Sequence, residues 1–220
     1  CEQNKLSLLN LNGCSNLETL YMNTQNVLDF DLPSFGAEMI FTINGCVKLK
    51  NLELGFVPIK ILNAEGCTAL ERVTSYESLI EAANFRNCTN LLGLNIYNTQ
   101  LATLNIEGCT KLDNISCNNN KLVTLNASGA TALNSVLVND NLLENLDFTG
   151  CTNLSTVFAS HNKLQNLALE NLPALNSLSL DNNLLSSLNL SNVNNLTSLN
   201  LDHNQLPAFD LANLPLLKNL

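Results

Sequence analysis

Cysteine is the residue type in this chain with the widest chemistry, since a thiol can form a disulfide, bind a metal or act as a nucleophile. Six of the eight cysteines recur in one slot of a repeated pattern, namely Cys14, Cys46, Cys67, Cys88, Cys109 and Cys151. Other copies fill this slot with apolar residues, which are Phe35, Ala130, Leu172, Val193 and Leu214. A slot of this kind faces a core, where a thiol packs as a small hydrophobe. We therefore expect buried free thiols.

Disulfides are the alternative for these cysteines. Equivalent positions on neighbouring strands lie about 4.8 Å apart, so Cys67, Cys88 and Cys109 come near disulfide range, although such a ladder points its sulfurs in parallel. Zinc sites favour close spacings such as CxxC, which these cysteines lack. We therefore expect no metal site built from cysteine.

The two histidines, His161 and His203, fall at equivalent corners two repeats apart. That spacing places their backbones roughly 9 to 10 Å apart, which is poor geometry for one site. Asp140, Asp181 and Asp202 lie near the same row, so a weak surface metal site is the alternative. No nucleophile, base and orienting group recur at one place. We expect no catalysis and no cofactor.

A 21-residue repeat positions all of these residues, and its plainest copy is LATLNIEGCTKLDNISCNNNK, residues 101–121. Each copy consists of an eleven-residue half, LxxLxLxxCxx, and a ten-residue half, LxxLxLxxNx. In both halves one polar residue separates an apolar pair such as Leu104 and Ile106, which is typical of a short strand with one buried face. Because each copy can bury its apolar face only against the next, the fold is a solenoid. We expect two short parallel strands per coil, little or no α-helix and weak curvature.

The motif LxxLxLxxNxL resembles the signature of leucine-rich repeats, and the match covers nearly the whole chain. The alternation of ten- and eleven-residue halves is similar to the IRREKO-type subclass, which occurs largely in bacterial proteins, many of them secreted or surface-exposed. The resemblance implies a leucine-rich repeat solenoid at the cell surface or outside the cell. It also implies a non-enzymatic scaffold for protein recognition or adhesion.

The unbroken period predicts a single solenoid domain over residues 1–220, with about ten coils. The chain begins and stops in the middle of a coil, so we expect a segment of a longer protein. The alternative is that Cys1 is the lipid-carrying cysteine of a processed lipoprotein. Uncovered terminal coils expose apolar side chains and unpaired strand edges, which favour end-to-end self-association.

One irregular coil is expected at residues 27–48, where two eleven-residue halves follow one another. Glu38 stands where every other copy has an apolar residue, and Pro33 and Gly36 are typical of turns. Either the strands exchange sides of the solenoid here, or residues 32–37 bulge out as a loop and the phase recovers.

The charge of the chain restricts its partners. With a net charge of −9 and only 10 Lys plus Arg, the sequence lacks the basic surface that phosphate neutralisation requires. No apolar run approaches the roughly 20 residues needed to span a bilayer. We therefore expect neither nucleic-acid binding nor a transmembrane segment.

Two rows of asparagine have structural interpretations. One row lies at the corner of the ten-residue half and consists of Asn120, Asn141, Asn162, Asn183 and Asn204. We expect these side chains to bond the backbone of their own and the adjacent coil. The other row is outward on the eleven-residue strand and consists of Asn63, Asn84, Asn105, Asn126 and Asn189. Because this row is uniform from coil to coil, we expect this face to have a structural role and not a role in recognition.

The outward slots of the ten-residue strand vary from coil to coil, which favours a recognition face. Tyr76 and Tyr97 fall on adjacent coils, as do Leu137 and Phe158, and apolar patches on a polar sheet are candidate contact sites. They could instead be cross-strand pairs that stabilise the sheet. The candidate ligand-binding residues are Glu53, Phe56, Tyr76, Tyr97, Leu137, Phe158 and His161.

The sequence leaves two functions open. In the first, the candidate residues bind a protein or a glycan. In the second, the chain is a structural spacer or stalk that presents another domain at a bacterial cell surface.

Overall fold

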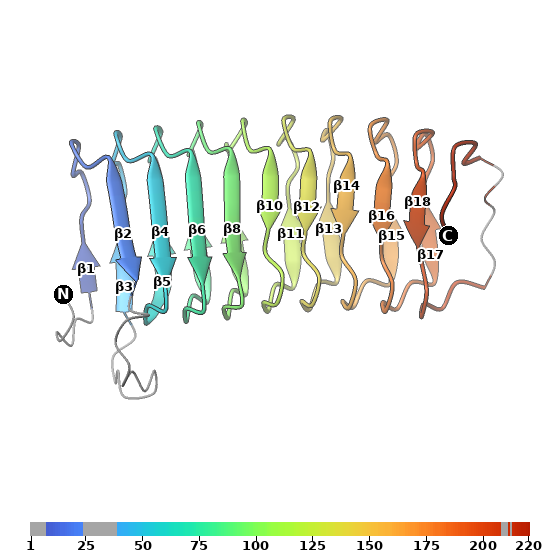
Figure 1. Cartoon of the computed structure of the whole chain (residues 1–220), viewed down its shortest axis with the longest axis horizontal. Helices are drawn as coiled ribbons and strands as arrows, with labels where there is room; N and C mark the ends of the chain where they lie inside the picture. The colour runs from blue at the N-terminus through green and yellow to red at the C-terminus, as the bar shows by residue number, and fades with distance from the viewer. Residues whose placement is uncertain (1–7, 24–38, 208–210, 212) are drawn as a thin grey trace. The chain divides into compact units, whose positions relative to one another are not determined.

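The computed structural model describes residues 8–23, 39–207, 211 and 213–220 (Figure 1). The chain forms two compact units, residues 1–109 and residues 110–220. Within each unit the strands come alternately from eleven-residue and ten-residue halves and form two separate rows, as Figure 1 shows. The described residues contain no α-helix. The prediction of short parallel strands, two per coil, is confirmed, while a single domain and weak curvature of the whole chain stay predictions.

Two parallel sheets build the first unit. The eleven-residue halves supply β1 (Leu8–Asn10), β3 (Met39–Thr42), β5 (Ile59–Asn63), β7 (Ala82–Asn84) and β9 (Thr103–Asn105), which pair in that order. The ten-residue halves supply β2 (Thr19–Asn23), β4 (Asn51–Gly55), β6 (Arg72–Tyr76) and β8 (Gly93–Tyr97), also paired in order. Each strand therefore meets its equivalent from the next coil.

The second unit follows the same plan with shorter strands. Its ten-residue halves supply β10 (Asn114–Ser116), β12 (Ser135–Leu137), β14 (Thr156–Phe158), β16 (Ser177–Ser179) and β18 (Ser198–Asn200), paired in that order. Its eleven-residue halves supply two pairs, β11 (Thr124–Asn126) with β13 (Asn145–Asp147), and β15 (Asn166–Ala168) with β17 (Ser187–Asn189).

The core of each unit lies between its two rows of strands. Inward side chains are fully buried, for example Leu52 and Leu62 in the first unit and Leu164 and Leu185 in the second. The alternation of apolar and polar residues aims every second side chain inward, so each strand keeps one variable row outward. Burial of one such leucine side chain stabilises the folded state by about 1.5 to 3 kcal/mol.

The corner asparagines hold successive coils together. The Asn162 side-chain amide donates to the Val138 carbonyl at 3.0 Å and to the Ala159 carbonyl at 3.1 Å, and its oxygen accepts from the Leu143 N–H at 2.9 Å. Asn141, with the same pattern, is buried as well. The prediction that this row bonds both its own and the adjacent coil is confirmed.

The outward asparagines of the eleven-residue strand close the turn that follows each strand. The side-chain oxygen of Asn105 accepts the N–H of Glu107 at 3.0 Å, and Asn126 accepts that of Ser128 at 2.9 Å. These contacts satisfy turn N–H groups within one coil. They agree with a structural role for this row.

The irregular coil predicted at 27–48 lies partly outside the described residues, because residues 24–38 are not among them. β1 pairs with β3 and β2 pairs with β4, so the described strands keep their sides of the solenoid. The pairing of β3 with β5 shifts register between Met39 and Ile40, and the buried Met39 lies opposite Ile59. The slot that the repeat assigned to Glu38 is thus taken by Met39.

Candidate functional site

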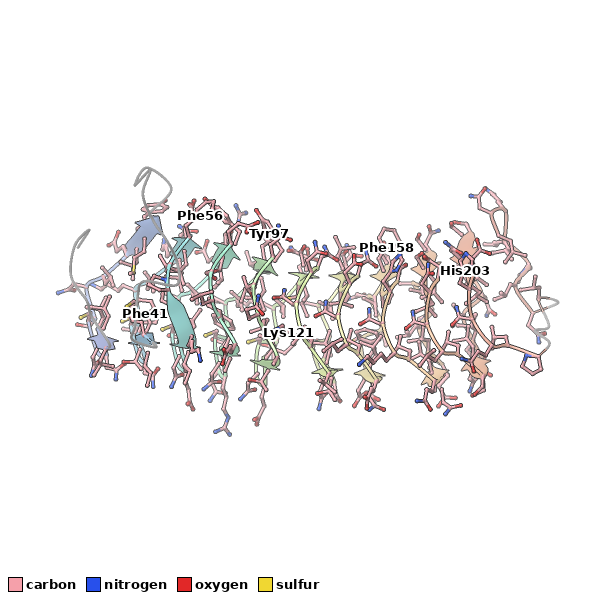
Figure 2. All side chains as sticks on the ribbon, turned by 90° about the horizontal axis from the view of Figure 1, so that it is seen from below. Phe41, Phe56, Tyr97, Lys121, Phe158 and His203 are labelled. Carbon is pink, nitrogen blue, oxygen red and sulfur yellow. The ribbon has the colours of Figure 1, made fainter. Side chains whose placement is uncertain are left out.

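The candidate binding surface of the first unit is the outward side of β4, β6 and β8. β4 and β6 alternate so that Leu52, Leu54, Val73 and Ser75 are buried, which leaves Glu53, Thr74 and Tyr76 partly exposed. Figure 2 shows Phe56 and Tyr97 projecting from the same edge of this unit. The structure thus places the predicted residues of this unit together on one face.

Three aromatic side chains form a contiguous group on this face, which we call the tyrosine patch: Phe56, Tyr76 and Tyr97. The Tyr76 and Tyr97 rings stack, with centroids 5.9 Å apart and planes at 14°, because the two residues are register partners on β6 and β8. Phe56 meets Tyr76 nearly at right angles, with centroids 5.6 Å apart. Tyr97 is 36% exposed. Such ring pairs add about 0.5 to 1.5 kcal/mol beyond area burial.

The corner beside the tyrosine patch carries unusual backbone geometry. Phe56 has φ +54° and Glu77 has φ +48°, in the left-handed region that most L-residues avoid. The equivalent corner positions elsewhere hold residues that tolerate this region better, namely Asn98, Asn119, Asp140, His161, Asn182 and His203. A phenylalanine and a glutamate therefore occupy strained positions next to Tyr76.

Two carboxylates flank the tyrosine patch. Glu53 lies on β4, in register between Tyr21 of β2 and Thr74 of β6. Glu77 directly follows Tyr76, is exposed, and accepts a hydrogen bond from the Asn98 amide at 2.9 Å. Side-chain ion pairs among the described residues occur elsewhere, between Lys60 and Glu81 for example, and none includes Glu53 or Glu77.

The predicted residues of the second unit form a smaller apolar pair and a separate polar cluster. Leu137 and Phe158 are register partners on β12 and β14, and both are partly exposed. His161 lies at the corner after β14, with its side chain 55% exposed and its Nε2 3.9 Å from Asp181 Oδ2. His161 therefore belongs to the polar cluster around Asp181.

Asp181 is the centre of that polar cluster. Burial raises the pKa of its carboxyl, but hydrogen bonds from Ser160, Asn182 and Ser179 outweigh burial and leave the pKa below its ordinary value. The Asn182 amide donates to Oδ2 at 2.8 Å and the Ser179 hydroxyl donates to Oδ1 at 2.9 Å. The Ser160 hydroxyl also donates to this carboxylate, so it is committed to Asp181 and not to the histidine. The Asn200 amide of the next coil donates to Oδ1 at 3.2 Å, so the Asp181 carboxylate links three coils.

The metal site considered from the sequence does not form within the described residues. No group of three or more His, Cys, Asp or Glu side chains there is placed to hold a metal ion.

The buried thiols form a regular ladder of hydrogen bonds to the preceding coil. The Sγ of Cys67 donates to the Ile43 carbonyl at 3.0 Å, that of Cys88 to Ala64 at 3.2 Å, and that of Cys109 to Phe85 at 3.1 Å. Cys46 and Cys151 follow the same rule. These cysteines are free and fully or almost fully buried, as predicted.

Cys14 departs from that prediction, because it is exposed. It belongs to the outermost coil among the described residues of the first unit, so no described coil covers its slot.

Burial makes the ladder thiols poor nucleophiles. Burial raises the pKa of Cys67, Cys109 and Cys151 to about 11, and it raises the pKa of Cys88 further. A thiolate is the reactive form of cysteine, so these residues stay protonated and inert near neutral pH. Their role is packing and coil-to-coil hydrogen bonding.

Two features of the site were missed at the sequence level. The thiol hydrogen bonds leave no signature beyond the apolar slot, because Ala, Val and Leu fill it equally well. The strained corner could have been found, since the position before each corner asparagine holds Asn, Asp or His in most copies and departs from this at Phe56 and Glu77.

Comparison with known proteins gives likenesses of structure alone. No family model matches the chain, and no curated protein sequence matches it. The functional domain of InlJ from Listeria monocytogenes, described as including a cysteine ladder, is 20% identical with a TM-score of 0.63, over 82% of this chain and 46% of that chain. YopM from Yersinia enterocolitica is 21% identical with a TM-score of 0.56, over 84% and 45%.

A third likeness is to Toll from Drosophila in its complex with Spatzle, which is 22% identical with a TM-score of 0.63, over 84% of this chain and 29% of that chain. The chain spans less than half the length of each of these three chains. Among the described residues, none forms a helix of the length and apolar character needed to cross a membrane. The 21-residue coils, the parallel sheets without helix and these likenesses together identify the chain as a leucine-rich repeat solenoid.

Proposed function

We propose that this chain is a non-catalytic scaffold that recognises a protein through the outward face of its ten-residue strands. The observation that carries the proposal is the tyrosine patch, in which two tyrosines and a phenylalanine from successive coils lie in contact and are partly or fully exposed on a mostly polar sheet. Tyrosine is enriched in protein interfaces because it combines a large apolar surface with a hydroxyl group. The Toll structure, which contains its protein ligand Spatzle, is an example of a similar solenoid that binds a protein.

The geometry of the rings favours a protein over a glycan. Sugar recognition by aromatic side chains uses an open ring face against the sugar. In the tyrosine patch one face of Tyr76 is directed at Tyr97, and Phe56 lies against Tyr76 as well. The stack thus takes up one face of each tyrosine ring, and the ring edges and hydroxyl groups beside it suit the mixed apolar and polar contacts of a protein interface.

The regular rows of the molecule support the alternative function of a spacer or stalk. Asparagine and cysteine ladders repeat from coil to coil and stabilise the stack without any ligand. In that case the tyrosine patch is a cross-strand contact that stabilises the sheet. A location outside the cell or at a bacterial surface, which the resemblance to IRREKO-type repeats implies, is part of both proposals.

Site-specific cross-linking distinguishes the two functions. A photoreactive amino acid at Thr74, between the outward residues of β4 and β8, is compared with the same amino acid at Thr103 on the eleven-residue sheet. We expect cross-links to one defined protein from position 74 and none from position 103. Cross-links from both positions in equal yield, or from neither, would contradict the proposed function and favour the spacer.

A further inference from the structure

The tyrosine patch and its flanking carboxylates together suggest what its partner carries. We propose that the patch binds a protein segment with arginine or lysine side chains that pair with Glu53 and Glu77, next to apolar side chains that cover Tyr76 and Tyr97. This proposal rests on the proposed function and adds the chemistry of the partner.

The charge beside the tyrosine patch favours a basic partner. Glu53 and Glu77 lie on two adjacent coils, Glu53 three residues before Phe56 and Glu77 directly after Tyr76, and the chain as a whole carries 19 acidic against 10 basic residues. The nearby ion pairs of the first unit, Lys60 with Glu81 and Arg86 with Glu65 and Glu107, belong to residues of the eleven-residue halves. Within the described residues, neither carboxylate of the patch takes part in an ion pair, and a basic partner complements them.

The backbone beside the tyrosine patch is strained, which is an observation independent of charge. Glu77 and Phe56 hold left-handed φ values at corner positions where asparagine would be more stable. Strained residues persist where the surrounding structure enforces them, and they cluster at binding sites. Both strained residues adjoin Tyr76, one before it in the stack of coils and one directly after it in the chain.

Ring geometry determines how a cation would approach. The stack turns one face of Tyr76 and one face of Tyr97 toward each other, and Phe56 lies against Tyr76, so a cation-π contact is left to the other face of Tyr97. We expect carboxylate pairing to hold a basic side chain beside Tyr76, where the Asn98 amide positions Glu77. The ring edges then receive the apolar neighbours of that side chain in the partner sequence.

Tyrosine fluorescence gives a direct readout of this surface. The chain has three tyrosines and no tryptophan, so a Tyr21→Phe background leaves only the two stacked tyrosines as reporters. The probe is a short peptide of alternating leucine and arginine, and the matched probe replaces each arginine with glutamate. We expect saturable quenching by the arginine peptide, weakening as salt is added, and no response to the glutamate peptide.

Variants then assign the effect to the two carboxylates. We expect Glu53→Gln with Glu77→Gln to weaken the arginine peptide about tenfold and to reduce the salt dependence. The matched control replaces two exposed glutamates of the second unit, Glu144→Gln with Glu170→Gln, and should leave affinity unchanged. Circular dichroism confirms that each variant keeps its fold.

The outcomes separate this inference from the proposed function. Equal binding of both peptides, no response at about 1 mM peptide, or an equal loss in both glutamine variants would overturn the basic-partner proposal. Cross-links from position 74 would still support the proposed function in each of these cases. If neither position cross-links, the proposed function fails whatever the peptides show.

Discussion

Glu77 occupies a backbone conformation that asparagine adopts more easily, and this gives a prediction about stability. Changing Glu77→Asn should stabilise the folded chain by about 0.5 to 1 kcal/mol, because asparagine tolerates φ near +48°. Urea unfolding measures the difference. The control Asn98→Gln, at an equivalent corner, should destabilise the chain. A loss of stability in Glu77→Asn would show that the Asn98 hydrogen bond to Glu77 outweighs the strain.

The cysteine ladder predicts different effects at equivalent slots. Cys88→Ala should lower the free energy of unfolding by about 1 kcal/mol, since it removes a buried sulfur that donates to the Ala64 carbonyl. Cys14→Ala is the matched control, and it should change stability little because Cys14 is exposed. Equal effects at the two positions, or a large loss of stability on adding reductant, would contradict packing by free thiols.

The raised thiol pKa values predict a loss of stability at alkaline pH. Unfolding returns Cys67, Cys109 and Cys151 from a pKa of about 11 to the ordinary value of 9.0. The unfolded chain therefore releases protons that the folded chain retains, so the thiol contribution is intact below pH 9 and is lost as the pH rises toward about 11.

A triple valine variant at these three positions provides the control for that pH dependence, because Val193 fills the same slot in another coil. Its unfolding free energy should decline less between pH 9 and 11 than that of the wild type. Parallel declines in the two proteins would mean that other groups cause the effect.

The burial of single residues could be predicted from sequence where many copies of the repeat show which residue types occupy one position. Ala, Val and Leu at the cysteine slot identified it as inward, and the structure agrees except at Cys14. The strain at Phe56 and Glu77 was missed, although Asn, Asp or His at the equivalent position of other coils indicates a left-handed corner there.

At the scale of the coil, the corner asparagines should dominate stability. Asn162→Ala leaves the Leu143 N–H without a partner and removes one of the two donors to each of the Val138 and Ala159 carbonyls, so we expect a loss of about 1 to 3 kcal/mol. Asn126→Ala is the control, since Asn126 is exposed and accepts one turn N–H. Thermal and urea unfolding measure both variants. Similar losses would refute the structural difference between the two rows.

Strands and sheets were the best predicted level, because a period of two within each half determines which side chains are buried. The exception is β3, whose register shift puts Met39 opposite Ile59. The repeat could not predict this shift, since the ten-residue half that would fix the phase is missing before it. Pairing of β1 with β3 and of β2 with β4 settles that the described strands keep their sides.

For the whole molecule, repetition explains why the fold is easier to predict than the function. Every coil carries the same pattern of buried residues, so the sequence shows this pattern many times. The proposed binding surface occurs once, in residues such as Glu53, Tyr76 and Tyr97 that differ from their equivalents in other coils. Sequence variation indicated which face to examine, and the structure added the stacked rings and the strained corner.

The most direct test of a recognition face on the ten-residue strands removes the outward aromatic residues and measures partner capture. The variant combines Tyr76→Ser, Tyr97→Ser and Phe158→Ser. The control combines Asn105→Ser, Asn126→Ser and Asn189→Ser on the eleven-residue strands, where serine can still accept the turn N–H. Quantitative mass spectrometry compares the proteins that each immobilised variant retains.

We predict that the aromatic variant retains its specific partner at least about tenfold less than the wild type, while the asparagine control retains it equally. Equal capture by both variants, or no specific capture by the wild type, would contradict a recognition face on the ten-residue strands and favour a spacer.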